Sequence, residues 1–129
     1  MKGIYLSYAN QDLSLAKSVK EQIENCGLTV CLIDHTEENL NGDVASEMLD
    51  GIKKSDVFLC LYSKHSNQSN FVSIELNAAV KREKQVYIIN TDNSYIEKKT
   101  NFAIANSVLL KGDVKKALQD FIAIMQKGV

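Results

Sequence analysis

Short apolar runs alternate with helix-periodic segments along this chain, and the alternation constrains its fold more than any other feature. The apolar runs that predict strands span residues 4–6, 28–33, 56–62, 86–90 and 107–110. The run over 56–62 is almost wholly apolar, as in a strand that is buried on both faces. Strands that alternate with helices indicate a parallel sheet that is covered on both sides.

Helical periodicity fills most of the intervals between these runs. A first helix follows Asp12, which can cap it, and ends near Gly27. A second covers 44–54, a third carries Glu75, and the last covers 114–125. The remaining interval, residues 91–106, is mixed in composition, and a short helix is expected there around residues 102–105.

Five such units fit an α/β, flavodoxin-like three-layer sandwich, and we expect a single domain over residues 1–129. Its five-stranded parallel sheet has the order 2-1-3-4-5, with helices on both faces. Ligands of such sheets bind beyond the carboxyl ends of the strands, at the switch point between the first and third strands. That rim would hold Ser7 and Tyr8 after the first strand, Asp34 after the second and residues 63–69 after the third.

Glu75 does not fit the pattern of its own helix. At 100° per residue it falls within an arc of apolar residues: Phe71, Val72, Ile74, Leu76, Ala78 and Ala79. A carboxylate on the face meant for the core is costly unless something pairs with it. It is therefore either held in a hydrogen-bond network or exposed to a cleft that uses its charge. We expect the cleft, because the helix leaves the switch-point rim less than two turns before Glu75.

Charge and composition exclude several classes of protein. The formal net charge of -1 leaves no electrostatic footprint for nucleic acid or an anionic membrane. No apolar run is long enough to span a bilayer, and the first one is too short for a signal peptide, so we expect a cytoplasmic protein. The three cysteines, Cys26, Cys31 and Cys60, lack the spacing of metal ligands and are interpreted as buried thiols, with no metal site.

Other chemistries of this fold lack their residues here. A response-regulator receiver needs an acidic pair after the first strand and an aspartate ending the third, where this chain has Ser7, Tyr8 and Ser63. Neither GxGxxG nor GxxxxGK[ST] occurs, so the usual nucleotide-phosphate loops are absent from the sequence. The serines near the rim lack an evident His/Asp relay.

Three collinear motifs resemble the Toll/interleukin-1 receptor (TIR) domain family. I-Y-L-S-Y-A-N-Q-D, over residues 4–12, resembles the opening of these domains. N-G-D-V-A-S-E-M-L-D-G-I-K-K-S-D, over residues 41–56, is similar to their glycine-containing loop, second helix and entry to the third strand. S-N-F-V-S-I-E-L, over residues 69–76, is similar to the motif S-x-W-x-x-x-E-L, with phenylalanine in the tryptophan place. The chain has no proline, whereas the family's association loop often contains one.

This resemblance implies an enzyme that splits the nicotinamide–ribose bond of NAD+, a substrate, without a further cofactor. The products would be nicotinamide and either ADP-ribose or a cyclic isomer. Glu75 would be the catalytic carboxylate. The residues that would line the substrate are Ser7, Tyr8, Asp34, Ser69 and Phe71.

The resemblance also implies self-association through the loop 34–43, a partner sensor or effector protein, and a role in defence or immune signalling. Two alternatives stay open: a non-catalytic TIR interaction module, and an enzyme similar to the nucleoside deoxyribosyltransferases. Structural roles compete with the catalytic ones as well. Glu75 could bind backbone amides, Ser69 could cap a helix, and Tyr8 could pack on the sheet edge.

Overall fold

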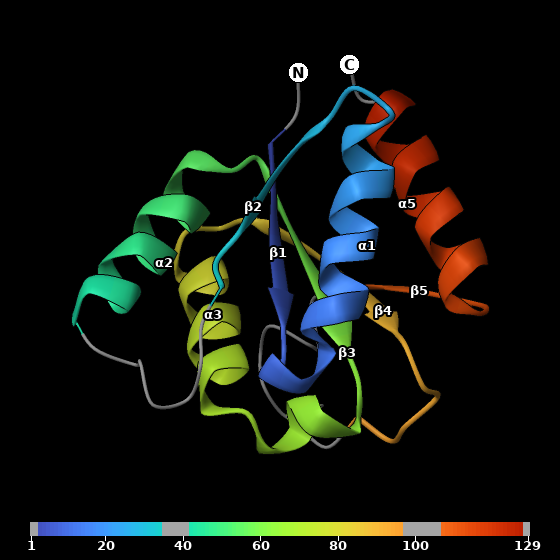
Figure 1. Ribbon diagram of the computed structural model, residues 1–129. Helices are drawn as coiled ribbons and strands as arrows, with labels where there is room; N and C mark the ends of the chain where they lie inside the picture. The colour runs from blue at the N-terminus through green and yellow to red at the C-terminus, as the bar shows by residue number, and fades with distance from the viewer. Residues whose placement is uncertain (1–2, 35–41, 97–106, 128–129) are drawn as a thin grey trace.

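The computed structural model describes residues 3–34, 42–96 and 107–127, which form one parallel sheet between two layers of helices (Figure 1). The strands are β1 (Gly3–Tyr8), β2 (Thr29–Leu32), β3 (Val57–Tyr62), β4 (Gln85–Asn90) and β5 (Val108–Leu110). They pair in parallel in the order β2-β1-β3-β4-β5, which confirms the expected fold class and strand order.

Helices cover both faces of the sheet: α1 and α5 lie on one face and α2 and α3 on the other (Figure 1). Their bounds are α1 (Leu13–Glu24), α2 (Gly42–Lys54), α3 (Asn70–Lys81) and α5 (Val114–Lys127), with 3-10 turns η1 (Asn10–Asp12) and η3 (Lys64–Gln68) leading into α1 and α3. The helix expected around residues 102–105 lies outside the described residues. So does most of the loop 34–43.

Each face of the sheet has its own apolar core. On β1 the side chains of Ile4, Leu6 and Tyr8 join the cluster under α1 and α5, whereas Tyr5 joins the cluster under α2 and α3. This division follows from the alternation of side chains along a strand. All six residues of β3 are buried, as its apolar sequence predicts for a central strand.

Asp12 does not cap α1 with its side chain, contrary to expectation. Its Oδ2 instead accepts a hydrogen bond from Ser63 Oγ at 2.5 Å. The 3-10 turn before α1 carries Asp12 toward the carboxyl end of β3, where Ser63 follows the strand. The pair therefore joins two chain segments at the switch-point edge of the sheet.

Ile74 lies outside the buried arc of α3, with 48% of its surface exposed. The buried side of the helix comprises Phe71, Val72, Glu75, Leu76, Ala78 and Ala79. The buried arc extends about 100° from Glu75 on one side and only about 60° on the other. Ile74 lies about 100° from Glu75 on the shorter side, so it is beyond the edge of the arc and faces outward. The expected arc is thus correct except at this edge.

The cysteines differ in burial. Cys60 is buried, Cys31 is partly buried, and Cys26 is exposed, contrary to the expectation of a buried thiol. Cys26 lies in the turn after α1, just before Gly27, whose φ of 86° is a left-handed conformation suited to glycine.

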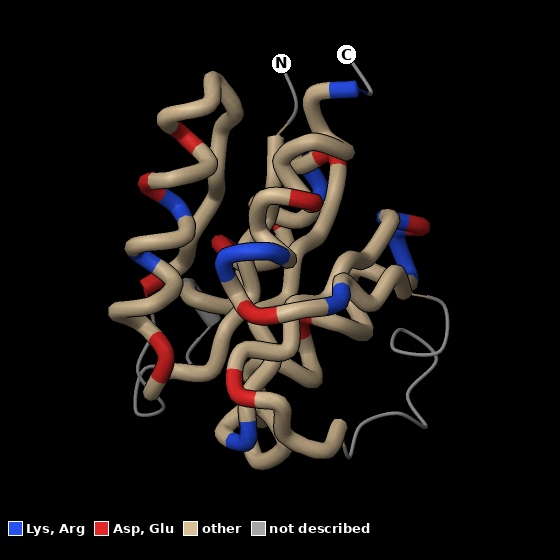
Figure 2. Tube along the Cα trace, turned by 90° about the vertical axis from the view of Figure 1, so that its right-hand side faces the viewer, with Lys and Arg blue, Asp and Glu red and all other residues tan. Residues whose placement is uncertain are grey.

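Acidic and basic residues are interspersed along the outer helices and loops (Figure 2). The mixture agrees with the formal net charge of -1. In the described part of the chain we find no helix with the length and apolar character that crossing a membrane demands.

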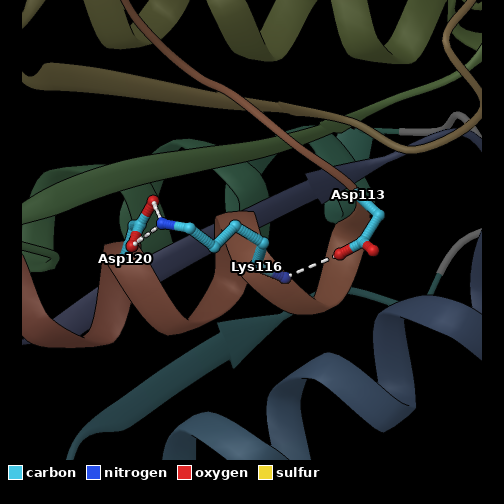
Figure 3. A network of polar contacts seen from close by, with 3 residues as sticks. All are labelled: Asp113, Lys116 and Asp120. Carbon is cyan, nitrogen blue, oxygen red and sulfur yellow. Dashed lines mark hydrogen bonds and ion pairs between the residues drawn. The ribbon is translucent and has the colours of Figure 1, made fainter.

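Asp113 caps the amino end of α5 (Figure 3). Its Oδ1 accepts a hydrogen bond from the Lys116 backbone N–H at 2.8 Å, and its carbonyl accepts one from Ala117 at 2.9 Å. The Lys116 ammonium lies 2.7 Å from the Asp120 carboxylate on the next turn, with both side chains well exposed. The cap satisfies a backbone donor that α5 itself leaves unpaired, whereas the ion pair is screened by water.

We expect Asp113→Ala to lower the free energy of unfolding by about 1 kcal/mol, because it removes the cap. Lys116→Met keeps the side-chain stem and loses only the exposed ion pair, so its effect should stay within roughly 0.5 kcal/mol. Urea denaturation of both variants measures the difference. Equal costs for the two substitutions would contradict this assignment.

Candidate functional site

Glu75 lies buried between α3 and the sheet, with 2% of its surface exposed. The Tyr5 hydroxyl donates to Glu75 Oε2 at 2.5 Å, and the Ser7 hydroxyl donates to Oε1 at 2.8 Å. Both donors come from β1 and are themselves buried. Each carboxyl oxygen thus has one hydroxyl partner, and the site is a carboxyl group held between two hydroxyls inside an apolar layer.

Serine caps set where α3 begins and therefore where Glu75 lies. Ser63 Oγ accepts a hydrogen bond from the His65 N–H at 3.1 Å at the start of η3. Ser66 Oγ in turn accepts one from the Ser63 N–H at 3.0 Å. Ser69 Oγ then accepts from the Val72 N–H at 3.2 Å and caps α3. With this start, the helix turns residue 75 toward β1.

Burial dominates the electrostatics of the site. Removal from water raises the pKa of Glu75 to about 8, and the hydrogen bonds from Tyr5 and Ser7 lower it toward the ionised form. Burial, followed by the nearby Glu75 charge, raises the pKa of Tyr5 far above its ordinary value. Tyr5 therefore stays a neutral donor at every pH at which Glu75 titrates.

The Tyr5 ring is fixed from two sides. It stacks on Phe58 of β3 with the ring centroids 5.5 Å apart and the planes 12° from parallel. On the α2 side, Gly51 leaves room for it: a Cβ at Gly51 would lie 3.0 Å from the Tyr5 ring and 2.8 Å from Cys31 Sγ. Glycine at this position lets α2 approach the sheet closely.

Gly51→Ala should therefore destabilise the protein, although alanine favours helices by about 1 kcal/mol over glycine. Forcing a methyl group into a packed core costs about 1–3 kcal/mol, and both nearest neighbours belong to the sheet layer. We expect a net loss of about 1 kcal/mol or more in urea denaturation. Adding Cys31→Ala, which removes the closer contact, should recover part of the loss. A Gly51→Ala protein more stable than wild type would contradict the close approach.

A groove of about 490 Å³ runs between β2 and α2 beside this cluster. Cys31, Ile33 and Gly51 are among its lining residues, whereas Tyr5 and Glu75 are not. The expectation that Glu75 is exposed to a cleft is therefore wrong for this structure: the carboxyl group is buried and held in a hydrogen-bond network. Nowhere in residues 3–34, 42–96 and 107–127 do three His, Cys, Asp or Glu side chains gather as a metal-binding group.

Of the site residues expected from the sequence, the structure brings Ser7 directly to Glu75. Phe71 is buried in the apolar cluster on the same side of the sheet, and Ser69 is buried as the cap of α3. Ser7 thus contacts Glu75, whereas Phe71 and Ser69 precede it by four and six residues in the chain.

Tyr8 and Asp34 differ from Ser7 in their placement. The Tyr8 side chain faces the α1 and α5 layer, and its hydroxyl donates to the Ile33 carbonyl at 2.6 Å. Asp34 is exposed just beyond β2. Tyr8 thus holds the backbone directly before Asp34, at the start of the loop 34–43.

Tyr5 is the site residue that the sequence analysis missed. Its contact with Glu75 joins residues 70 positions apart, so no local motif contains it. The alternation of side chains along a strand could have identified it, because Tyr5 is two residues before Ser7 and therefore faces the same side of the sheet.

A family model described as TIR domain matches residues 4–121. The chain belongs to the TIR domain family. A search of curated protein sequences finds no significant match to this TIR domain.

Several solved structures share the fold of this TIR domain. The TIR domain of the Toll-related receptor TRR-2 from Hydra magnipapillata is 13% identical over 99% of this chain and 98% of its own, with a TM-score of 0.71. A 2-deoxyribosyltransferase from Bacillus psychrosaccharolyticus is 17% identical over 93% and 90%, with a TM-score of 0.69. The CMP N-glycosidase BcmB from Clostridium botulinum is 15% identical over 99% and 100%, with a TM-score of 0.65. At these identities the likeness is one of fold.

Proposed function

We propose that this TIR domain cleaves the nicotinamide–ribose bond of NAD+, with Glu75 as the catalytic carboxylate. The observation that carries the proposal is a buried carboxyl group on an otherwise apolar helix face, held by the hydroxyls of Tyr5 and Ser7. A buried, hydrogen-bonded carboxyl group with a strongly raised pKa is typical of a functional site.

The chemistry of NAD+ suits such a group. When the bond between ribose C1′ and the nicotinamide nitrogen breaks, its electron pair leaves with nicotinamide, which departs as a neutral base. The ribose is left with oxocarbenium character, which an ionised carboxylate in a poorly solvated site stabilises electrostatically. Water then adds to C1′ and loses a proton to give ADP-ribose. Attack by a base nitrogen of the same molecule gives a cyclic isomer.

The expected substrate residues divide between two parts of the site. Ser7, Ser69 and Phe71 would border the pocket around Glu75. Tyr8 would act through the Ile33 carbonyl, by holding the chain that leads to Asp34 and the association loop.

Substrate reaches Glu75 only when its cover moves, because 2% of the residue is exposed. TIR domains associate through TIR–TIR contacts, and we infer that association through the loop 34–43 opens this site. Activity should then rise more steeply than protein concentration. A partner sensor or effector protein would supply that clustering in defence or immune signalling.

A second candidate is cleavage or exchange of a nucleoside N-glycosidic bond. It is favoured by the fold shared with a 2-deoxyribosyltransferase and a CMP N-glycosidase. The same carboxylate would serve, because a ribosyl or deoxyribosyl cation develops in either reaction. The third candidate, a TIR interaction module without catalysis, needs no function for Glu75 beyond packing.

Incubation of the chain with NAD+ at high protein concentration and with a crowding agent separates these candidates. We expect nicotinamide together with ADP-ribose or its cyclic isomer, resolved by chromatography and mass. Glu21→Gln, an exposed change on α1, is the matched control and should behave as wild type. Base exchange on a deoxynucleoside with NAD+ intact would establish the second candidate. Assembly without either reaction would establish the third.

A further inference from the structure

Tyr5 makes the shortest contact to Glu75 in the site, at 2.5 Å from hydroxyl to Oε2. Its side chain is fully buried in the cluster under α2 and α3. A hydroxyl placed inside an apolar cluster costs free energy unless it is hydrogen-bonded, and the Glu75 carboxyl provides that partner. Phenylalanine would fill the same space without any polar group, so packing alone does not account for tyrosine at this position.

The two hydroxyls constrain the carboxyl group in complementary ways. Tyr5 binds Oε2 and Ser7 binds Oε1, so rotation of the planar group about its last bond would break both contacts. An ionised carboxylate offers about four acceptor positions, and these two bonds occupy two of them. These two bonds leave one acceptor position on each oxygen unused.

The two donors are fixed by packing within the sheet layer. The Tyr5 ring is stacked on Phe58 and closed off by Gly51, and Ser7 lies in the middle of the sheet beside β3. Glu75 reaches them from α3 through a flexible side chain. A functional group is positioned best when its supporting residues are locked by packing on regular elements, and β1 meets that condition here.

We propose that Tyr5 is a positioning residue of this TIR domain, whose hydroxyl fixes the Glu75 carboxylate in its reacting orientation. The reaction that this orientation serves rests on the proposed function. The contact between Tyr5 and Glu75 does not.

The hydrogen bond from Tyr5 also affects the pKa of Glu75, in a direction that can be predicted. The Tyr5 hydrogen bond lowers the pKa of Glu75 against the opposing effect of burial, so its removal should raise that pKa. Other titratable side chains near this layer include Cys31 on β2, with Glu47 and Asp50 of α2 beyond it, Cys60 and Tyr62 on β3, and Tyr8 on β1. Tyr5→Phe leaves all of them in place.

Steady-state kinetics of Tyr5→Phe on NAD+ test the proposal. We expect kcat at pH 7 to fall about tenfold or more, KM to stay within about threefold, and the acid limb of the pH profile to move to higher pH. Tyr87→Phe is the matched control, because Tyr87 packs against Phe121 under the other helix layer.

A merely structural role for Tyr5 would change stability and leave the acid limb where it is. Wild-type kcat and an unmoved acid limb in Tyr5→Phe, with Glu75→Gln inactive, would overturn the proposal.

A second readout does not depend on NAD+ cleavage. Carbon-13 NMR of glutamate labelled at the side-chain carboxyl follows the titration of Glu75, whose signal is identified by its loss in Glu75→Gln. We expect the midpoint in Tyr5→Phe to lie above that of wild type by about one pH unit. If the wild type cleaves no NAD+ and the midpoint still moves, the proposed function fails while the coupling of Tyr5 to Glu75 stands. An unchanged midpoint overturns the positioning role in either case.

Discussion

Replacement of Glu75 by glutamine is expected to slow NAD+ cleavage at least about a thousandfold, because the negative charge that stabilises the ribosyl cation is lost. Glutamine keeps the size and shape of the side chain. Its amide oxygen accepts one hydroxyl, but its NH₂ group is a donor and cannot accept from the other. Nicotinamide release under assembling conditions measures the effect.

Three further observations would show that the loss of activity comes from the missing carboxylate and not from a defect in folding or association. The variant should keep the wild-type far-ultraviolet circular dichroism, since the buried ionised form is the costly state and glutamine is neutral. It should associate as the wild type does, because Glu75 is enclosed and does not reach a surface. Glu21→Gln should retain full activity. Residual cleavage within tenfold of wild type would remove Glu75 from the chemistry.

The fold could be predicted from the sequence because the patterns that indicate its strands and helices are local and recur along the chain. Residues 57–62 are apolar without interruption, and such a strand has only a central place in a parallel sheet. The helix carrying Glu75 is amphipathic over more than two turns, so a single misplaced residue, Ile74, leaves the assignment intact. The expected order of the five strands came from fitting the alternation of elements to the flavodoxin-like arrangement.

The site followed only in part, because its contacts join distant segments. Helical spacing marked Glu75 as unusual, but what it meets depends on the register between α3 and β1, which no short motif encodes. Asp12 shows the same limit. Its sequence position predicts a helix cap, yet Ser63 from the end of β3 engages its carboxylate. A tertiary contact took precedence over the local preference in that case.

Glu75 should also make the stability of the protein fall as pH rises, which is the reverse of the usual behaviour of a carboxylate. Its pKa is raised from 4.5 to about 8 in the folded state, so between these values the folded chain binds a proton that the unfolded chain has released. Stability therefore decreases with pH, by up to about 1.4 kcal/mol per pH unit for one group. The contribution is complete below about pH 4.5 and is lost as pH rises through about 8.

Urea denaturation from pH 5.5 to 7.5, compared between wild type and Glu75→Gln, measures this slope. Burial acts to raise the pKa of Asp92, but its hydrogen bonds with Ser94 and Lys64 together lower that pKa below its ordinary value, so Asp92 is already ionised there. Burial raises the pKa of the Cys31 thiol above its ordinary value, which keeps it neutral throughout. Glu75→Gln removes the titrating group and should flatten the slope, whereas Glu21→Gln should keep it. Parallel slopes in wild type and Glu75→Gln would mean that Glu75 is ionised in the folded protein, and that its two hydroxyl partners outweigh the cost of its burial.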